Sequence, residues 1–148
     1  FEISWDDFAS FWIPLDPVTV DTGAMKFAKG SHKWGKVYKP VMIGSGNDAE
    51  GAAEFDGHAP DIDADPDRYN VEMFEMQRGD ALFFHAATLH AAEPNRSSDV
   101  RRRALSLRYA GSRATFEPRD YVPSRPEMPE LKPGGPLDGD DYPVIWRA

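Results

Sequence analysis

Two histidines and a run of arginines are the residues of this sequence best suited to chemistry. His85 and His90 stand five positions apart, on either side of a run of small residues, and three arginines at 101–103 follow. Neutral imidazole is the commonest metal-binding side chain, and a guanidinium binds a carboxylate through two parallel hydrogen bonds. These residue types therefore indicate a metal site beside an anion site. The alternative is two ordinary strands with hydrogen-bonded histidines and solvated arginines.

The segment 102–110 alternates in character, as a strand with two different faces does. Its odd positions carry Arg103, Leu105, Leu107 and Tyr109, and its even positions carry Arg102, Ala104, Ser106, Arg108 and Ala110. Successive side chains of a strand point to opposite faces. We therefore predict a packed apolar odd face and a small, polar even face headed by Arg102. The alternative is a strand entrance that carries three solvated arginines.

The two histidines are weaker indicators than the arginine. His85 follows "ALFF" and ends a predicted buried strand, so we expect it to have a structural role. His90 follows a turn. Across a hairpin, His90 and Arg102 face the same cavity, one binding a metal and the other the carboxylate of a metal-bound acid. The local spacing permits this arrangement and does not require it.

Short β segments separated by turn signals are expected to position these side chains, because the sequence has no long helical period. Pro14 and Pro17 confine the first segment to a sheet edge or to an early stop. Many short strands with Gly/Pro turns predict an all-β sandwich or barrel. The six predicted strands are 8–15, 24–28, 71–76, 81–85, 88–92 and 102–110.

Two segments without periodicity complete the chain. Residues 44–69 form a polar, acidic, glycine-rich stretch, and a loop of this length inside a compact domain is usually functional. A proline-rich tail runs from 117 to 148, and its closing "YPVIW" is apolar enough to pack on the body. We therefore predict one β domain over residues 1–116, with the tail 117–148 packed against it.

The composition excludes several classes of function. The chain has 148 residues, which suits one domain, and no cysteine, which excludes disulfides, thiolate nucleophiles and Cys-ligated metals. A formal charge of -8 disfavours nucleic acid and anionic membranes as partners. No apolar run approaches the roughly 18 residues of a membrane span. We expect a cytoplasmic protein whose partner is a small-molecule substrate; the sequence leaves the oligomeric state open.

The stretches "WIPLDPVTVDTGAMKFAKGSHKWG" and "GDALFFHAATLHAAEPNRSSDVRRRALSLRYA" follow one another along the chain. In this unbroken order they resemble the phytanoyl-CoA dioxygenase family of Fe(II)/2-oxoglutarate oxygenases. The shared pattern is a Trp–x–x–Leu–Asp strand, a Gly–Ser–His–Lys loop and a Gly–Asp turn into a Phe–His strand. Leu–His, Pro–Asn and an Arg–x–Ala strand follow. The resemblance spans about Ser10 to Gly111, and the tail "LKPGGPLDGDDYPVIW" is similar to the carboxy-terminal extension of bacterial members.

The resemblance implies a double-stranded β-helix, a jelly-roll of the cupin kind, with Fe(II) and 2-oxoglutarate as cofactors. His90 is then the distal iron ligand, Arg102 binds the C5 carboxylate of 2-oxoglutarate, and Trp12 lines the cosubstrate pocket. The implied activity is hydroxylation of a small organic or lipid-like substrate with release of succinate and CO2. Ala92 stands where many members have a serine, so one hydrogen bond to the cosubstrate is absent.

The iron-binding His–x–Asp pair of the family is absent from the 148 residues. In the family this pair precedes the Trp strand, so we expect it upstream of Phe1 and the β-helix of this chain to be incomplete at its N-terminus. Two alternatives stay open. One is a non-catalytic jelly-roll that serves as a binding or scaffold domain, and the other is a metal-dependent cupin that does not use 2-oxoglutarate.

Overall fold

The computed structural model describes residues 3–39, 55–119, 131–140 and 142–146. All six predicted strands are present, each within two residues of its predicted start and end. Two short 3-10 helices, η1 and η2, accompany them. The elements are η1 Trp5–Asp7, β1 Phe8–Pro14, β2 Met25–Ala28, η2 Ser31–Lys33, β3 Val71–Phe74, β4 Leu82–His85, β5 His90–Ala92 and β6 Ala104–Ala110.

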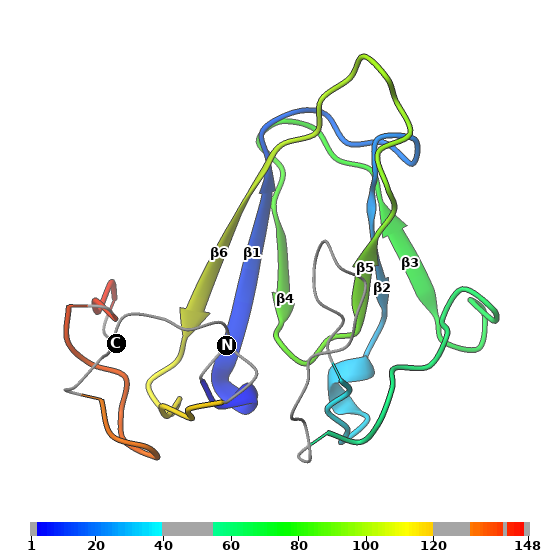
Figure 1. Cartoon of the computed structure of the whole chain (residues 1–148). Coiled ribbons are helices and arrows are strands. Elements are labelled where there is room, and N and C mark those ends of the chain that lie inside the picture. The colour runs from blue at the N-terminus through cyan, green and yellow to red at the C-terminus, as the bar shows by residue number, and fades with distance from the viewer. Residues whose placement is uncertain (1–2, 40–54, 120–130, 141, 147–148) are drawn as a thin grey trace.

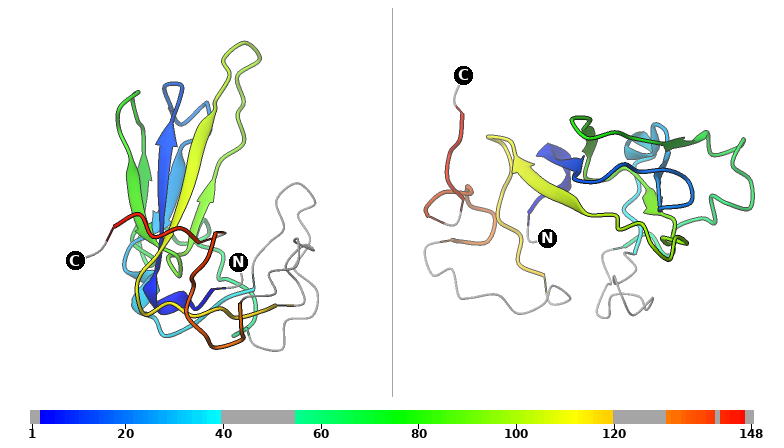
Figure 2. Two further views of the ribbon diagram at one scale, coloured as in Figure 1. Left: turned by 90° about the vertical axis from the view of Figure 1, so that its left-hand side faces the viewer. Right: turned by 90° about the horizontal axis from the view of Figure 1, so that it is seen from above.

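The strands form two antiparallel three-stranded sheets, in the orders β4-β1-β6 and β3-β2-β5. Figure 1 shows them as two leaves that converge at the loops at the top of the view, the closed end, and lie further apart below, the open end, where residues 86–89 connect β4 to β5. The view from above in Figure 2 shows that the chain passes repeatedly from one leaf to the other. This is the predicted all-β jelly-roll, since the chain crosses from one sheet to the other after β1, β3, β4 and β5 instead of completing one sheet before the next.

Of the two outcomes predicted from the prolines, a sheet edge or an early stop, the structure has the early stop. β1 is the central strand, with β4 on one side and β6 on the other. Proline is tolerated because it occupies the last position of β1, Pro14, opposite Ala104 at the start of β6. The early stop, the other half of the same expectation, is confirmed, because a proline within the strand would remove a ladder hydrogen bond.

The alternation of β1 decides which side of its sheet faces the interior. Its even-numbered residues, Phe8 to Pro14, are buried and its odd-numbered ones are half-buried. The register places the even positions of β6 on the buried side of β1 and the odd ones on the outer side. The odd positions of β6 are therefore not the packed face that we predicted, because Leu105 is 46% exposed and Phe83, on the same outer side of the sheet but on β4, is 64% exposed.

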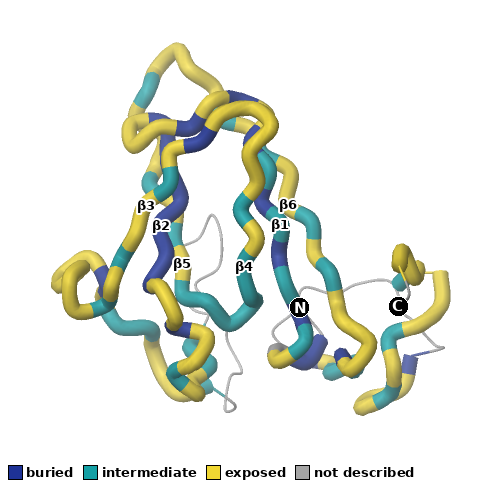
Figure 3. The backbone as a smooth tube through the Cα atoms, turned by 180° about the vertical axis from the view of Figure 1, so that it is seen from behind, coloured by how far each residue is buried: buried dark blue, intermediate teal, exposed yellow. Residues whose placement is uncertain are grey.

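The core lies between the two leaves, where Figure 3 shows the buried stretches of β1 and β2. Trp12 from one sheet and Phe27 from the other belong to a single cluster of buried side chains. Two rings of the opposite leaves, Phe27 and Phe84, lie 4.9 Å apart between centroids. The remaining buried members of the cluster are Val18, Ala24, Met25 and Met76. The leaves are thus held together by apolar packing near their closed end.

Lys26 of β2 holds the described part of the acidic 44–69 stretch, through Asp63, against the outer side of the β3-β2-β5 sheet. Lys26 is only 5% exposed, and its Nζ lies 2.6 Å from Asp63 and 2.5 Å from Glu93. Burial alone would lower the pKa of Lys26, but the two carboxylates outweigh it and raise this pKa. Residues 44–54 of the predicted loop lie outside the described residues.

The tail returns to the body only in part. The Phe116 N–H donates to Gly135 O at 2.9 Å, and Tyr142 packs near the buried pair Ile3 and Phe8. The rest of the closing "YPVIW" does not pack on the body as predicted, since Trp146 is 77% exposed and Val144 and Ile145 are also exposed. The division into 1–116 and 117–148 stays a prediction. None of the described helices is long and apolar enough to cross a membrane.

Candidate functional site

Arg102 and Trp12 meet at the closed end of the leaves. The guanidinium carbon of Arg102 lies 5.7 Å from the centroid of the Trp12 ring, which is within the range of a cation–π contact. The Arg102 Nε is buried and makes no hydrogen bond to any residue that the structure describes. A buried guanidinium nitrogen normally has an acceptor. This unmatched donor is therefore a physical reason to expect a carboxylate at Arg102.

Gly23 lies close to the Arg102 guanidinium, and its lack of a side chain makes room for the arginine. Its φ is +96°, in the left-handed region that favours glycine. A Cβ at this position would lie 2.5 Å from the carbonyl oxygen of Glu93 and 3.3 Å from Nη2 of Arg102. By its residue types alone, the Asp21, Thr22 and Gly23 stretch indicates only a turn between two strands. The contact between Gly23 and Arg102 arises because the fold places the 93–102 connection next to this turn.

An ion pair at the next position sets the direction of Arg102. Asp16 accepts hydrogen bonds from the backbone N–H of Arg103 at 3.0 Å, from its Nε at 2.9 Å and from its Nη2 at 2.8 Å. The Leu15 N–H also donates to the Arg103 carbonyl at 2.9 Å. Since neighbouring side chains of an extended chain point to opposite sides, fixing Arg103 toward Asp16 directs Arg102 toward Trp12. Arg103 is thus an ion-pair partner, not the merely solvated neighbour that the sequence suggested.

This ion pair gives a prediction for stability against pH. Arg103, which donates to the carboxylate, holds the pKa of Asp16 well below its usual value. A carboxyl whose pKa is depressed by folding stabilises the native state above its unfolded pKa, near 3.8, and loses that contribution as the pH falls toward the folded pKa. We expect Asp16→Asn to lower the Tm at pH 7 by roughly a few degrees. The difference from wild type should narrow below about pH 4.

The measurement is thermal unfolding followed by circular dichroism between pH 7 and pH 2.5. Asp21→Asn is the matched control, because Asp21 is an exposed aspartate of the same loop. We expect that control to show the wild-type Tm throughout. A gap between Asp16→Asn and wild type that stays constant down to the lowest pH would contradict the assignment.

His90 begins β5 on the opposite leaf and faces the interior. Its ring stacks on Phe27 at 5.7 Å between centroids and contacts Phe84 at 4.8 Å. Its Nδ1 lies 2.7 Å from the carbonyl oxygen of Thr88, so Nδ1 carries the proton and donates it. Nε2 makes no hydrogen bond with the residues that the structure describes, and it is the basic nitrogen of this tautomer. A backbone carbonyl that fixes Nδ1–H in this way is the usual partner of a metal-binding histidine.

The surroundings keep His90 in the form that a metal requires. The protein around the ring removes water from it and lowers its pKa, although one edge stays open to solvent. Arg108 lowers the same pKa further through its charge, and the Thr88 carbonyl opposes both effects. The imidazole is therefore neutral at pH 7, with a lone pair available for a cation.

His90 alone does not make a metal centre. Among residues 3–39, 55–119 and the described parts of the tail, no three His, Asp or Glu side chains are grouped as metal ligands. A facial iron site takes two histidines and one carboxylate. The site therefore fits one ligand of such a centre, and the prediction that the other two come from outside the chain stays open.

The hairpin that the sequence suggested between His90 and Arg102 does not form. β5 pairs with β2, whereas β6 pairs with β1, so the two side chains belong to opposite leaves. They are linked through the core, since Arg102 contacts Trp12 and His90 contacts Phe27. A strand pairing of this kind depends on contacts distant in sequence, which local spacing does not reveal.

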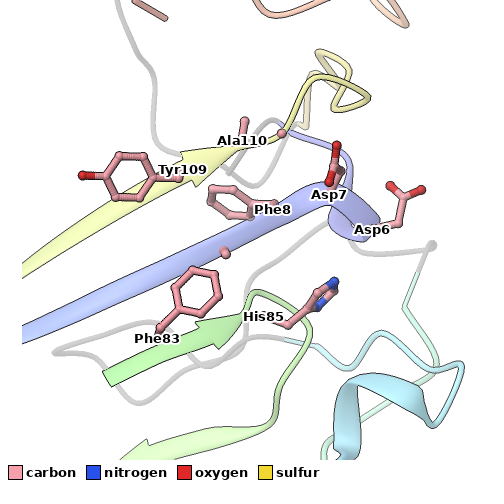
Figure 4. Close-up of a pocket in the computed structure, with 9 residues that line it drawn as sticks. Asp6, Asp7, Phe8, Phe83, His85, Tyr109 and Ala110 are labelled. Atoms are coloured by element: carbon pink, nitrogen blue, oxygen red, sulfur yellow. The ribbon is translucent and has the colours of Figure 1, made fainter. Parts of the chain in front are cut away.

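A pocket of about 360 Å³ lies on the other side of the β4-β1-β6 sheet (Figure 4). Its walls include Phe83, His85 and Tyr109, with Asp6 and Asp7 at the rim. The His85 Nδ1 accepts a hydrogen bond from the Ala87 N–H at 3.1 Å. His85 is thus held by its own turn, on the face of the sheet opposite to the one that carries Trp12.

The sequence matches the phytanoyl-CoA dioxygenase (PhyH) family over residues 4–104, about two thirds of the chain. The chain belongs to the phytanoyl-CoA dioxygenase family. The cofactors of this family are Fe(II) and 2-oxoglutarate. The matched range contains β1 to β5 and Arg102, so all three candidate site residues fall within it, while β6 begins at its last residue.

Two curated relatives agree with the family assignment. The chain is 35% identical over 105 residues to 1-deoxypentalenic acid 11-beta-hydroxylase of Streptomyces arenae, which is 68% of this chain and 34% of that protein. It is 33% identical over 109 residues to a probable alpha-ketoglutarate-dependent hypophosphite dioxygenase of Stutzerimonas stutzeri, which is 74% of this chain and 36% of that protein. The matched part is thus about a third of each relative.

Solved structures of non-heme alpha ketoglutarate dependent enzymes share the fold. The epimerase SnoN of nogalamycin biosynthesis, in complex with Fe3+, alpha ketoglutarate and nogalamycin RO, superposes with a TM-score of 0.68 at 24% identity. The carbocyclase SnoK of the same biosynthesis superposes with a TM-score of 0.67 at 25% identity. The matches cover 97% and 99% of this chain but 52% of SnoN and of SnoK.

Proposed function

We propose that this chain supplies one iron ligand and the cosubstrate clamp of an Fe(II)/2-oxoglutarate-dependent dioxygenase. The proposed reaction hydroxylates a small organic or lipid-like substrate and releases succinate and CO2. The observation that carries the proposal is the buried Nε of Arg102, which lacks an acceptor beside Trp12. The guanidinium lacks a hydrogen-bond acceptor at Nε among the described residues, and the imidazole on the facing leaf is neutral and able to bind a metal. Together they suit a metal-bound diacid, whose second carboxylate would accept from the guanidinium.

Each of the three residues has a distinct task in this proposal. Arg102 binds the C5 carboxylate of 2-oxoglutarate, and Trp12 provides the apolar wall that keeps water from that ion pair. His90 offers Nε2 to the metal, while Nδ1–H donated to Thr88 O fixes the plane of the ring. Bound iron supplies the O2-dependent oxidation, coupled to decarboxylation of the cosubstrate.

We expect the two remaining iron ligands, a His–x–Asp pair, from residues outside this chain. The lengths of the relatives support this, because the chain spans about half of SnoN and SnoK. The alternative is a non-catalytic jelly-roll that binds or scaffolds, and the absence of a three-ligand group among the described residues is the observation in its favour.

The test uses the full-length protein encoded by the complete gene. Under anaerobic conditions we expect it to bind Fe(II) and 2-oxoglutarate together, and in air to form succinate from 2-oxoglutarate. An open reading frame without His–x–Asp or His–x–Glu upstream of Phe1, together with no succinate, would establish the binding or scaffold alternative. Binding of Fe(II) without any effect of 2-oxoglutarate would favour a cupin of another type.

The names of the two curated relatives support an anionic substrate. One acts on 1-deoxypentalenic acid and the other is named for hypophosphite, so each substrate carries a negatively charged group. We propose the same general class here. A cytoplasmic location also stays a prediction.

A further inference from the structure

Ser10 is one of three buried serines among the described residues. It is 3% exposed, and the other two are Ser31, also 3% exposed, and Ser4, 8% exposed. These two hydroxyls each accept a hydrogen bond from a backbone N–H, Ser4 Oγ from Thr115 at 3.0 Å and Ser31 Oγ from Leu89 at 2.8 Å. The Ser10 hydroxyl makes no hydrogen bond to any residue that the structure describes. Burying a hydroxyl without a partner costs free energy, so Ser10 indicates a partner that the described chain does not supply.

The side chain of Ser10 points into the space between the two leaves. The even-numbered residues of β1 are its buried ones, so Ser10 shares a face with Trp12 of the core. In the register Ser10 lies opposite Phe84 of β4, and Phe84 contacts His90 of the facing leaf at 4.8 Å between ring centroids. Solvent reaches this side of the sheet, because Ser106, which lies opposite Trp12 on the same face, is exposed. A molecule between the leaves can therefore approach Ser10.

The spacing along β1 places Ser10 between the two parts of the candidate site. Trp12, whose ring centroid lies 5.7 Å from the guanidinium carbon of Arg102, is two residues further along the same face, which is about 7 Å. β1 runs from the open end of the leaves to the closed end (Figure 1), so Ser10 lies on the His90 side of Trp12. This spacing suits a diacid whose carboxylates are separated by three carbon atoms. A 2-oxoglutarate whose C5 carboxylate is bound at Arg102 therefore brings its 2-oxo acid end to the level of Ser10.

We propose that the Ser10 hydroxyl donates a hydrogen bond to the 2-oxo acid end of bound 2-oxoglutarate. This inference rests on the proposed function and adds a residue that holds the cosubstrate, besides Arg102 and Trp12. A serine hydroxyl has one proton to donate, and its hydrogen bond to a carboxylate is strengthened by the charge of the acceptor. The hydroxyl has no partner until the cosubstrate arrives, so it contributes to binding and not to the stability of the ligand-free protein.

The test compares cosubstrate affinity with the stability of the ligand-free protein, both measured on the full-length protein. Calorimetric titration with 2-oxoglutarate in the presence of Zn2+ gives the affinity without turnover, and thermal unfolding without ligand gives the Tm. We expect Ser10→Ala to weaken 2-oxoglutarate binding about tenfold, while its Tm equals or exceeds that of wild type. Ser10→Cys keeps the shape of the side chain but is a weak donor, so we expect a similar loss of affinity.

Ser4→Ala is the matched control, because Ser4 is a buried serine whose hydroxyl has a backbone partner. This variant should have a lower Tm than wild type and a 2-oxoglutarate affinity within about twofold of it. Wild-type affinity in Ser10→Ala would overturn the proposal. A fall in Tm like that of Ser4→Ala would overturn it too, by assigning the Ser10 hydroxyl to the fold.

A double variant shows which end of the cosubstrate Ser10 contacts. Arg102→Lys weakens the hold on the C5 carboxylate, at the other end of the molecule. Adding Ser10→Ala should multiply that loss of affinity by a further factor of about ten, because the two residues contact separate groups. A double variant that binds 2-oxoglutarate as well as Arg102→Lys does would overturn the proposal, since Ser10 would then act through Arg102. Failure of wild type to bind 2-oxoglutarate would instead reject the proposed function.

Discussion

Arg102→Leu is expected to weaken 2-oxoglutarate binding by the full-length protein by about 30-fold or more, equivalent to about 2 kcal/mol. The substitution removes the charged partner of a carboxylate in a site shielded by Trp12, which is only 7% exposed. Leucine keeps much of the volume against the indole, so the change tests the charge and not the packing. Calorimetric titration with 2-oxoglutarate in the presence of Zn2+ measures the effect without turnover.

Two further variants separate the role of the guanidinium from that of the strand. Arg102→Lys keeps the charge but offers no planar pair of donors, so we expect an intermediate affinity. Arg103→Leu disrupts the ion pair with Asp16 and should lower the Tm, with a smaller loss of 2-oxoglutarate affinity that arises from poorer positioning of Arg102. If Arg102→Leu binds 2-oxoglutarate as wild type does, the clamp is elsewhere and the proposed function loses its principal support.

His90→Ala is expected to lower the affinity of the full-length protein for Fe(II) by more than about 100-fold, since losing even an outer-shell partner costs 10–100-fold. The physical reason is the tautomer: Thr88 O fixes the proton on Nδ1 and leaves Nε2 as the donor atom. Because burial and Arg108 hold the pKa of His90 below its ordinary value, protons compete with the metal only at mildly acidic pH and below. Anaerobic competition with a chromophoric chelator measures the change.

His85→Ala is the matched control for this experiment. The two histidines are five positions apart, but His85 lies on the outer side of its sheet and stacks against His32 at 5.4 Å. We expect His85→Ala to leave Fe(II) affinity within about twofold of wild type, as for a site without shared contacts. Equal losses for the two variants would show that the effect comes from the fold and not from coordination.

The sequence alone determined the elements and the direction of the key side chains. The period of two residues along a strand is a local property, so alternation located all six strands and separated Arg102 from its neighbours. The family followed from the order of short motifs, and the match over residues 4–104 confirms it. The roles of His90, Arg102 and Trp12 remain predictions, which the variants above test.

The tertiary structure decided which of these side chains meet. β1 pairs with β4 and β6, whose partner residues are at least seventy positions away in sequence, and β5 pairs with β2 instead of forming a hairpin with β6. Such pairings follow from burial between the leaves, because each strand must turn its apolar face toward the core and its other face away from it. They bring Asp16 to Arg103 and Gly23 to Arg102, and they set Ser10 in the row that reaches His90. No local pattern contains these contacts, because each joins residues from different turns of the jelly-roll.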